Sequence, residues 1–223
     1  MLMLSYLSLG FGVALFLPLI FWPAGTWQWT QGWLYVGIIL LNFLINFTYL
    51  WQVNRELIRY RMMLGAGTKR WDIIWAAVFG PLFVSIYVVA GFDAVRFVWS
   101  EMAAGWWWRG VVLHVAGAWL FGWSMGVNPF FEKTVRIQTE RGHRVIDSGP
   151  YAFVRHPGYV GFMGWALAVP LLLGSWWAFL PALLAMIGMV VRTALEDMTL
   201  YEELEGYQAY STRVRYRLVP GVW

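Results

Sequence analysis

Long apolar runs recur along this chain and limit it to folds that use lipid as solvent. A membrane-spanning helix needs about 20 consecutive, mostly apolar residues. Only 13% of the residues are charged, against about 25% in a soluble domain. The pattern predicts an all-α integral membrane bundle of five to six transmembrane segments in a single domain, residues 1–223. The predicted spans are 2–22, 32–53, 71–91 and 110–131, followed by two shorter apolar runs at 158–173 and 176–192.

The two ends of the chain predict further elements. No Lys or Arg precedes the first run, so it lacks the basic start of a signal peptide, and we expect a retained first helix. Gly174 and Ser175 alone separate the last two runs, which predicts a tight helical hairpin. From about Ala194 the chain turns polar, and spaced leucines among acidic residues predict an amphipathic cytoplasmic helix that ends near Gly206.

Basic residues set the expected orientation. They concentrate in segments 54–70 and 132–156 and in the tail, whereas the intervening loops 23–31 and 174–175 have none and 92–109 has only Arg96 and Arg109. The positive-inside rule therefore places both termini and both basic loops in the cytoplasm. The 17 Trp and 11 Tyr suit a protein with two bilayer interfaces. A multi-pass protein of a bacterial inner membrane fits these features.

The residue types exclude several kinds of site. The chain has no Cys, so disulfides, thiolate metal ligands and thiol nucleophiles are absent. Three scattered His without an HExxH motif are a poor metal ligand set. There is no Walker loop, and GAG at 65–67 is only a fragment of a dinucleotide fingerprint. A net charge of +4 on so hydrophobic a chain does not favour a nucleic-acid partner.

Polar residues gather in three segments on the predicted cytoplasmic side. They are QTERGHRVI (138–146), GPYAFVRHPGYVG (149–161) and a group made of Arg192, Glu196 and Asp197. Arg192 and Glu196 are four residues apart and share one helix face. Ionisable groups at membrane depth are costly and are functional candidates by default. Opposite charges, an imidazole and tyrosines together suit a zwitterionic or doubly charged ligand that enters from the cytoplasm.

Each segment also has a structural interpretation when it is taken alone. Arg155 and His156 can mark the cytoplasmic edge of the helix that follows them. His143 in a basic loop is more often solvated, and Arg192 with Glu196 can be an ordinary helix pair.

Residues outside these segments have structural interpretations as well. We expect Arg213, Arg215 and Arg217 in the tail to contact anionic lipid head groups. His114, within a span, is expected to be a satisfied residue of the bundle.

The segments VRIQTERGHRVIDSGPYAFVRHPGYVG and RTALEDMTLYEELEGYQAYSTRVRYRLVPGVW resemble the isoprenylcysteine carboxyl methyltransferase family and its phospholipid-methyltransferase relatives. The resemblance covers roughly residues 130–223. A G-x-Y-x-x-x-R-H-P-x-Y-x-G element followed by R-x-x-x-E-[ED]-x-x-L before a polar tail carries it. It implies a membrane enzyme that binds S-adenosylmethionine in a cytoplasmic pocket. Residues 131–223 then supply the cofactor loop, hairpin and tail, and residues 1–130 supply four helices.

The resemblance also implies roles for particular residues. The substrate-side arginine falls on Arg192, and Arg192 with Glu196 are the expected catalytic pair. Asp197 stands where the family often has a second Glu, which keeps the charge and shortens the reach. The implied cofactor contacts are Gln138, His143, Arg144, Val145, Ile146, Tyr151, His156, Pro157, Gly158, Tyr159 and Glu196.

These residue types agree with the implied chemistry. Glu196 would hold the donor's amine, and backbone N–H groups of residues 143–146 would read its adenine or carboxylate. Tyr151 or Tyr159 would face the sulfonium through a cation–π contact of about 0.5–2 kcal/mol. Arg192 would orient a carboxylate or phosphate of the acceptor. For an anionic acceptor, alignment and desolvation are then the main tasks.

Several alternatives stay open at this stage. The acceptor is a prenylcysteine carboxylate, a phospholipid amine, an isoprenoid acid or a hydrophobic thiol, and a neutral amine needs Glu196 or His156 as base. Membrane sterol reductases, which use NADPH, share a Y-x-x-R-V-x-Y-R-L-like tail. A non-catalytic transporter or subunit anchor is the third class, and its polar residues would be spread through several spans. The expected partners are a lipophilic or prenylated substrate and membrane lipid.

Overall fold

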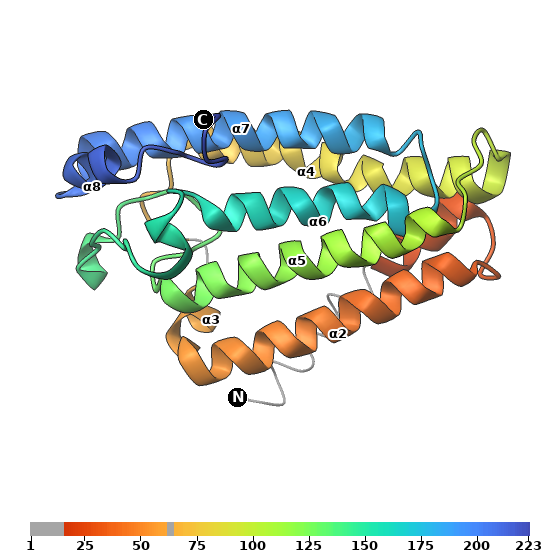
Figure 1. Ribbon diagram of the computed structural model, residues 1–223, viewed down its shortest axis with the longest axis horizontal. Helices are drawn as coiled ribbons and strands as arrows, with labels where there is room; N and C mark the ends of the chain where they lie inside the picture. The colour runs from red at the N-terminus through yellow and green to blue at the C-terminus, as the bar shows by residue number, and fades with distance from the viewer. Residues whose placement is uncertain (1–15, 62–64) are drawn as a thin grey trace. The chain divides into compact units, whose positions relative to one another are not determined.

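The computed structural model describes residues 16–61 and 65–223, and all regular structure in these ranges is helical (Figure 1). Residues 16–24 form a helix ahead of α2. The π-helix η1 (Phe92–Phe97) continues α4, and the 3-10 turns η2 (Thr139–Arg141) and η3 (Gly149–Ala152) follow α5. The predicted all-α class is confirmed. The α-helices are α2 (Thr30–Val53), α3 (Arg55–Arg61), α4 (Arg70–Gly91), α5 (Gly105–Val127), α6 (Pro157–Leu173), α7 (Phe179–Glu203) and α8 (Tyr207–Arg213).

Most of the predicted spans correspond to helices of the structure. The predicted first span, 2–22, lies largely in residues 1–15, outside the described residues. The run at 158–173 forms α6, which is apolar but shorter than a full span. Four helices in the described ranges are long and apolar enough to cross a membrane: Thr30–Val53, Arg70–Phe97, Gly105–Val127 and Phe179–Glu203.

The C-terminal helices differ in detail from the prediction. Residues 174–178 join α6 to α7, and Gly174 has φ +76°, a conformation that favours glycine where a helix ends. The hairpin itself stays a prediction. The polar stretch from Ala194 is not a separate helix but continues α7 to Glu203. The helical structure is interrupted between α7 and α8 at Gly206, which has φ +81°, near the predicted end of the helix.

The contacts of the chain group it into two compact units. Unit 1 consists of residues 1–47, 80–115 and 165–185. Unit 2 consists of residues 48–79, 116–164 and 186–223. The single domain stays a prediction.

Unit 1 contains a buried carboxylate that joins its loops. Asp93, in η1, is fully buried. Its Oδ2 accepts hydrogen bonds from Ser100 Oγ at 2.7 Å and Ser175 Oγ at 2.6 Å, and from the backbone N of Trp177 at 3.2 Å. Because a buried charge needs such donors, Asp93 fixes the segments that follow η1 and α6.

Unit 1 also contains a buried histidine without a partner. His114 is 1% exposed, and its ring lies edge-on to Tyr35 at 6.4 Å and Trp165 at 6.1 Å between centroids. Neither ring nitrogen has a hydrogen-bond partner in the part of the chain that the structure describes. The expectation that His114 is satisfied is therefore wrong.

Unit 2 is held together by close helix contacts. Trp75 Nε1 donates to the carbonyl of Gly188 at 2.7 Å, which joins α4 to α7. A Cβ at Gly161 would lie 2.6 Å from the carbonyl oxygen of Gly117 and from the amide nitrogen of Phe121. The backbones of α6 and α5 therefore approach so closely that only glycine fits at position 161.

Candidate active site

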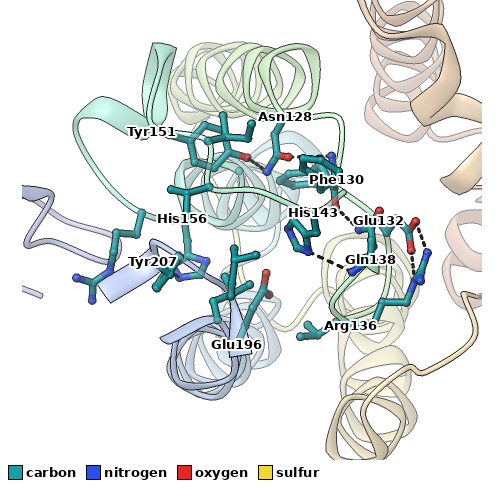
Figure 2. A pocket seen from close by; sticks show the side chains of 18 of the residues that line it. Asn128, Phe130, Glu132, Arg136, Gln138, His143, Tyr151, His156, Glu196 and Tyr207 are labelled. Carbon is teal, nitrogen blue, oxygen red and sulfur yellow. Dashed lines mark hydrogen bonds and ion pairs between the residues drawn. The ribbon is translucent and has the colours of Figure 1, made fainter. Parts of the chain in front are cut away.

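Unit 2 contains a cavity of about 780 Å³, part of it open to solvent (Figure 2). The loop between α5 and α6 forms one wall, and the first turn of α6 with α7 and α8 forms the rest. The walls come from residues 128–146, 151–159 and 192–204, together with Tyr207 and Tyr210.

Gln138 and Arg141 shape the loop that carries the first predicted segment. Gln138 is 2% exposed, and its Nε2 donates to the carbonyl of Phe130 at 2.8 Å. Arg141 Nη1 donates to Gln138 Oε1 at 2.5 Å, and Nη2 donates to the carbonyl of Pro129 at 2.9 Å. The guanidinium also lies 3.7 Å from the ring centroid of Tyr60. The side chain of Gln138 thus holds the loop as well as lining the cavity.

A buried ion pair braces the same loop. The carboxylate of Glu132 accepts two hydrogen bonds from Arg136, from Nε and Nη2, both at 2.9 Å (Figure 2). The pair raises the pKa of the Arg136 guanidinium above its ordinary value. Such a two-pronged contact fixes both side chains more tightly than a single bond.

His143 is half-buried in the loop wall rather than solvated. Its Nδ1 accepts a hydrogen bond from the backbone N of Gln138 at 3.3 Å, and its ring packs against Phe130 at 4.5 Å between centroids (Figure 2). Burial, with a smaller effect of Arg141, lowers the pKa of His143 to about 4. The imidazole is therefore neutral near pH 7, and because Nδ1 is an acceptor, Nε2 carries the proton.

Tyr151 closes the end of the cavity next to α5. It is buried, and its hydroxyl accepts from Asn128 Nδ2 at 3.2 Å (Figure 2). Its carbonyl accepts from the hydroxyl of Tyr210 at 2.8 Å. Burial raises the pKa of Tyr151, so this tyrosine stays a neutral phenol.

Asp197 is the centre of a buried charge network behind the cavity. It is 4% exposed. Its two carboxylate oxygens accept from Arg155 Nε at 2.8 Å and Nη2 at 2.9 Å. Tyr207 donates its hydroxyl at 2.7 Å, and His156 Nε2 lies at 3.1 Å. Arg217 Nε adds a further bond at 2.7 Å.

The same residues attach the C-terminal tail to the site. The backbone N of Arg155 donates to the carbonyl of Tyr216, and that of His156 donates to the carbonyl of Arg217, both at 2.9 Å. Arg155 Nη1 also donates to the carbonyl of Val214 at 3.1 Å. Arg155 and His156 are thus buried parts of the site, and they do not merely mark a helix edge.

Tyr159 and Glu196 meet at the cavity surface. The hydroxyl of Tyr159 donates to Glu196 Oε2, and the Tyr159 ring stacks on His156 at 5.6 Å with an interplanar angle of 6°. Glu196 therefore presents a half-buried carboxylate to the cavity, with its orientation set by the first turn of α6 (Figure 2).

Arg192 is paired with an aspartate that the sequence motifs do not include. Its Nε lies 3.0 Å from Oδ1 of Asp72 in α4, which is 2% exposed. Nη2 donates to the carbonyl of Lys133 at 2.8 Å. The guanidinium carbon lies 4.5 Å from the ring centroid of Trp75 and 5.5 Å from that of Tyr159. The ion pair of Arg192 is thus with Asp72 and not with Glu196.

The structure brings the predicted site residues together with one exception. Pro157 does not line the cavity; it begins α6, the position at which proline is favoured. The predicted residues that line the cavity are Gln138, His143, Arg144, Val145, Ile146, Tyr151, His156, Gly158, Tyr159, Arg192 and Glu196.

Other cavity residues were not predicted from the sequence. Tyr207 and Tyr210 had a detectable signal, because their spacing of three puts two aromatic rings on one face of a short helix. Arg155 belongs to the R-H-P element but was not assigned a contact there, and the remainder belong to the loop that precedes Gln138 or carry no distinctive spacing. The cavity residues that were missed are Asn128, Phe130, Phe131, Glu132, Thr134, Val135, Arg136, Arg155, Leu200, Leu204, Tyr207 and Tyr210.

The fold and the cavity define the class of this protein: it is all-helical, with membrane-length helices and a polar cavity in its C-terminal half. A sequence model of the isoprenylcysteine carboxyl methyltransferase (ICMT) family matches residues 110–202, from α5 to the end of α7. The resemblance inferred from the motifs is confirmed over this segment. The apolar helices and this match identify the chain as an integral membrane protein.

Curated relatives match over a short stretch. The protein-S-isoprenylcysteine O-methyltransferase of Schizosaccharomyces pombe is 44% identical over 45 residues, which are 20% of this chain and 19% of that protein. Probable protein-S-isoprenylcysteine O-methyltransferases of Oryza sativa subsp. indica and subsp. japonica are each 42% identical over 43 residues, 19% of this chain and 22% of theirs. The match therefore spans about a fifth of the length of these relatives.

Proposed function

We propose that this protein is an S-adenosylmethionine-dependent methyltransferase that methylates the carboxylate of a lipophilic, isoprenylcysteine-like acceptor. One observation carries the proposal: the cavity of unit 2 is lined by every residue that the family resemblance assigns to the cofactor or substrate, except Pro157. The family match over residues 110–202 covers most of the cavity. The relatives' names supply the acceptor class.

The lining of the cavity fits the methyl donor. Glu196 offers a carboxylate for an amine, and residues 143–146 also line the cavity. Tyr159 offers an aromatic face to a sulfonium, and neutral His143 offers an Nε2–H donor. S-adenosylmethionine supplies an electrophilic methyl group when it is bound.

The residues of the chain then have defined tasks toward the acceptor. An ionised carboxylate is already a nucleophile, so no residue has to remove a proton. Arg192 holds the carboxylate in line, because Asp72 and the rings of Trp75 and Tyr159 fix its guanidinium. Alignment of this kind lowers the activation barrier, because the orientational entropy is lost on binding and not in the reaction step. Leu200 and Leu204 in the wall help to exclude water, which strengthens the interactions of the charged groups.

Calorimetric binding of S-adenosylhomocysteine to the detergent-purified full chain tests the donor site. We expect micromolar binding to the wild type, at least about 10-fold weaker binding to Glu196→Gln because a charge-assisted hydrogen bond is lost, and weaker binding to His156→Ala. Glu202→Gln is the matched control, since Glu202 is exposed on the same helix. Transfer of a labelled methyl group to an N-acetyl-S-prenylcysteine tests the acceptor.

The outcomes separate the enzyme classes. Binding of S-adenosylhomocysteine that NADPH does not displace supports the methyltransferase. A folded wild type that binds NADPH and not S-adenosylhomocysteine contradicts it. Methyl transfer to phosphatidylethanolamine but not to the prenylcysteine keeps the donor and overturns the proposed acceptor.

A further inference from the structure

Two guanidinium groups converge on the short segment 131–133, which forms part of the cavity wall. Nη1 of Arg61, the last residue of α3, donates to the carbonyl of Phe131 at 2.9 Å. Nη2 of Arg192 donates to the carbonyl of Lys133 at 2.8 Å. Phe131 and Arg192 both line the cavity, and the Arg61 guanidinium lies 5.5 Å from the Phe131 ring centroid. Arg61 and Arg192 are therefore anchored to carbonyls only two residues apart.

Positive charge is in excess at this wall. The ion pair with Asp72 at 3.0 Å neutralises Arg192, and Glu132 is already paired through two hydrogen bonds of 2.9 Å. Neither Arg61 nor Lys133 makes an ion pair with a carboxylate anywhere in residues 16–61 and 65–223. Arg61 and Lys133, which lie next to the cavity wall without lining it, thus have no carboxylate in direct contact in the described residues, and Glu132 acts on Arg61 only from farther away.

The ionisation of the two groups agrees with this geometry. The pKa of Arg61 is lowered to about 10, mainly by burial and also by the charge of Arg192. The pKa of Lys133 is lowered by partial burial and by the charge of Arg61. An anion placed among these groups would reverse both effects, because a nearby opposite charge favours the charged form.

We propose that Arg61 and Lys133 form, with Arg192, an anion-binding subsite that takes the carboxylate of the methyl acceptor. The subsite rests on the proposed function for the identity of that acceptor, and it adds two residues outside the family motifs. Arg61 and Arg192 contribute planar donors suited to a carboxylate, and Lys133 contributes a mobile point charge. The phosphate of a phospholipid has the same recognition chemistry, so the test includes both anions.

The experiment compares an acid with its neutral analogue. N-acetyl-S-farnesylcysteine and its carboxamide are titrated into the detergent-purified full chain, without a methyl donor. The wild type should bind the acid more tightly than the amide. Arg61→Gln should weaken binding of the acid by roughly 10- to 100-fold, the loss typical of a hydrogen bond to a charged group, and leave binding of the amide nearly unchanged. Lys133→Gln should have a smaller effect in the same direction.

Controls separate charge from fold. Arg59→Gln removes the same charge from an exposed position of α3 and should change neither affinity. Arg61→Lys should restore part of the acid affinity. S-adenosylhomocysteine should bind Arg61→Gln as it binds the wild type. A lost affinity for S-adenosylhomocysteine in Arg61→Gln overturns the proposal, since Arg61 then acts on the donor site or on the fold.

The remaining outcomes also decide the question. Unchanged affinities of Arg61→Gln for both the acid and phosphatidylethanolamine vesicles, or equal losses for acid and amide, contradict the subsite. If Arg61→Gln binds phosphatidylethanolamine vesicles more weakly than the wild type but binds the prenylcysteine acid equally well, the subsite binds phosphate. The carboxylate assignment then fails. If the wild type does not bind S-adenosylhomocysteine, the proposed function fails, and the acid–amide comparison still tests the subsite.

Discussion

Replacement of Asp197 with Asn should strongly destabilise unit 2. The substitution keeps the size of the side chain and removes the negative charge that two arginines share. Arg155, which is 8% exposed, would lose the partner of both its Nε and Nη2 at 2.8 and 2.9 Å. Arg217 would lose its bond at 2.7 Å, and the new amide NH2 would face donors.

The two arginines contribute unequally to the loss. Breaking a buried ion pair by removing one partner costs about 3–5 kcal/mol, because the other charge stays buried without compensation. Arg217 has a side chain that is 34% exposed, and pairs of that kind contribute about 0–1 kcal/mol. The total expected loss is about 3–6 kcal/mol, which for a protein of this size lowers Tm by roughly 6–24 °C.

Thermal unfolding followed by intrinsic tryptophan fluorescence in one detergent measures this effect. Arg217→Gln is the control and should lower Tm by only a few degrees. The double variant Arg155→Met with Asp197→Leu should recover part of the stability, because the uncompensated charge of Arg155 is removed, whereas Tyr207 and Arg217 still lack their acceptor. A Tm of Asp197→Asn within about 2 °C of the wild type would refute the reasoning.

Three further perturbations test other parts of the structure. Stability should fall as the pH drops from about 6.5 to 4. The pKa of His143 is about 4 in the folded protein and near 6.5 in the unfolded chain, so the unfolded state binds the proton first. His143→Gln should flatten this part of a plot of Tm against pH. Gly161→Ala should cost about 1–3 kcal/mol, measured by thermal unfolding, because the added methyl would meet backbone atoms of α5 at 2.6 Å. His114→Leu should raise Tm, because it removes two buried ring nitrogens that lack partners, each of which costs about 1–3 kcal/mol; a lower Tm would show that the imidazole is satisfied.

The membrane-length helices were predictable because hydropathy alone reports them. Lipid requires every backbone group to be paired within its own helix, so a long apolar run permits one local structure. The end of the last helix was less predictable. The change in polarity near Ala194 indicates where the environment of the helix changes from apolar to polar. The helix itself commonly ends near a helix-breaking residue such as Gly or Pro. Residues 194–203 contain no Gly or Pro, and α7 runs on to Glu203.

The motif residues were predictable as a group, and their partners were not. The element at residues 149–161 is local in sequence, so its spacing could be read directly. Arg192 and Asp72 are 120 residues apart, and no pattern in the sequence indicates that pairing. Arg217 was expected at lipid head groups, because three arginines alternate in the tail. In the structure it donates to Asp197, which only the folded tail makes possible.

The end of α7 shows how one helix assigns different tasks to neighbouring acidic residues. Residues four apart on an α-helix are separated by about 40° around its axis, and adjacent residues by about 100°. Arg192 and Glu196 therefore share a face, and both line the cavity. Asp197 is turned away from that face and meets Arg155, Tyr207 and Arg217 instead. A one-residue shift of register in α7 would exchange the two carboxylates, leave the tail without its anchor and put the buried charge into the cavity. The two members of the adjacent pair Glu196-Asp197 thus have different places, because one lines the cavity and the other holds the tail.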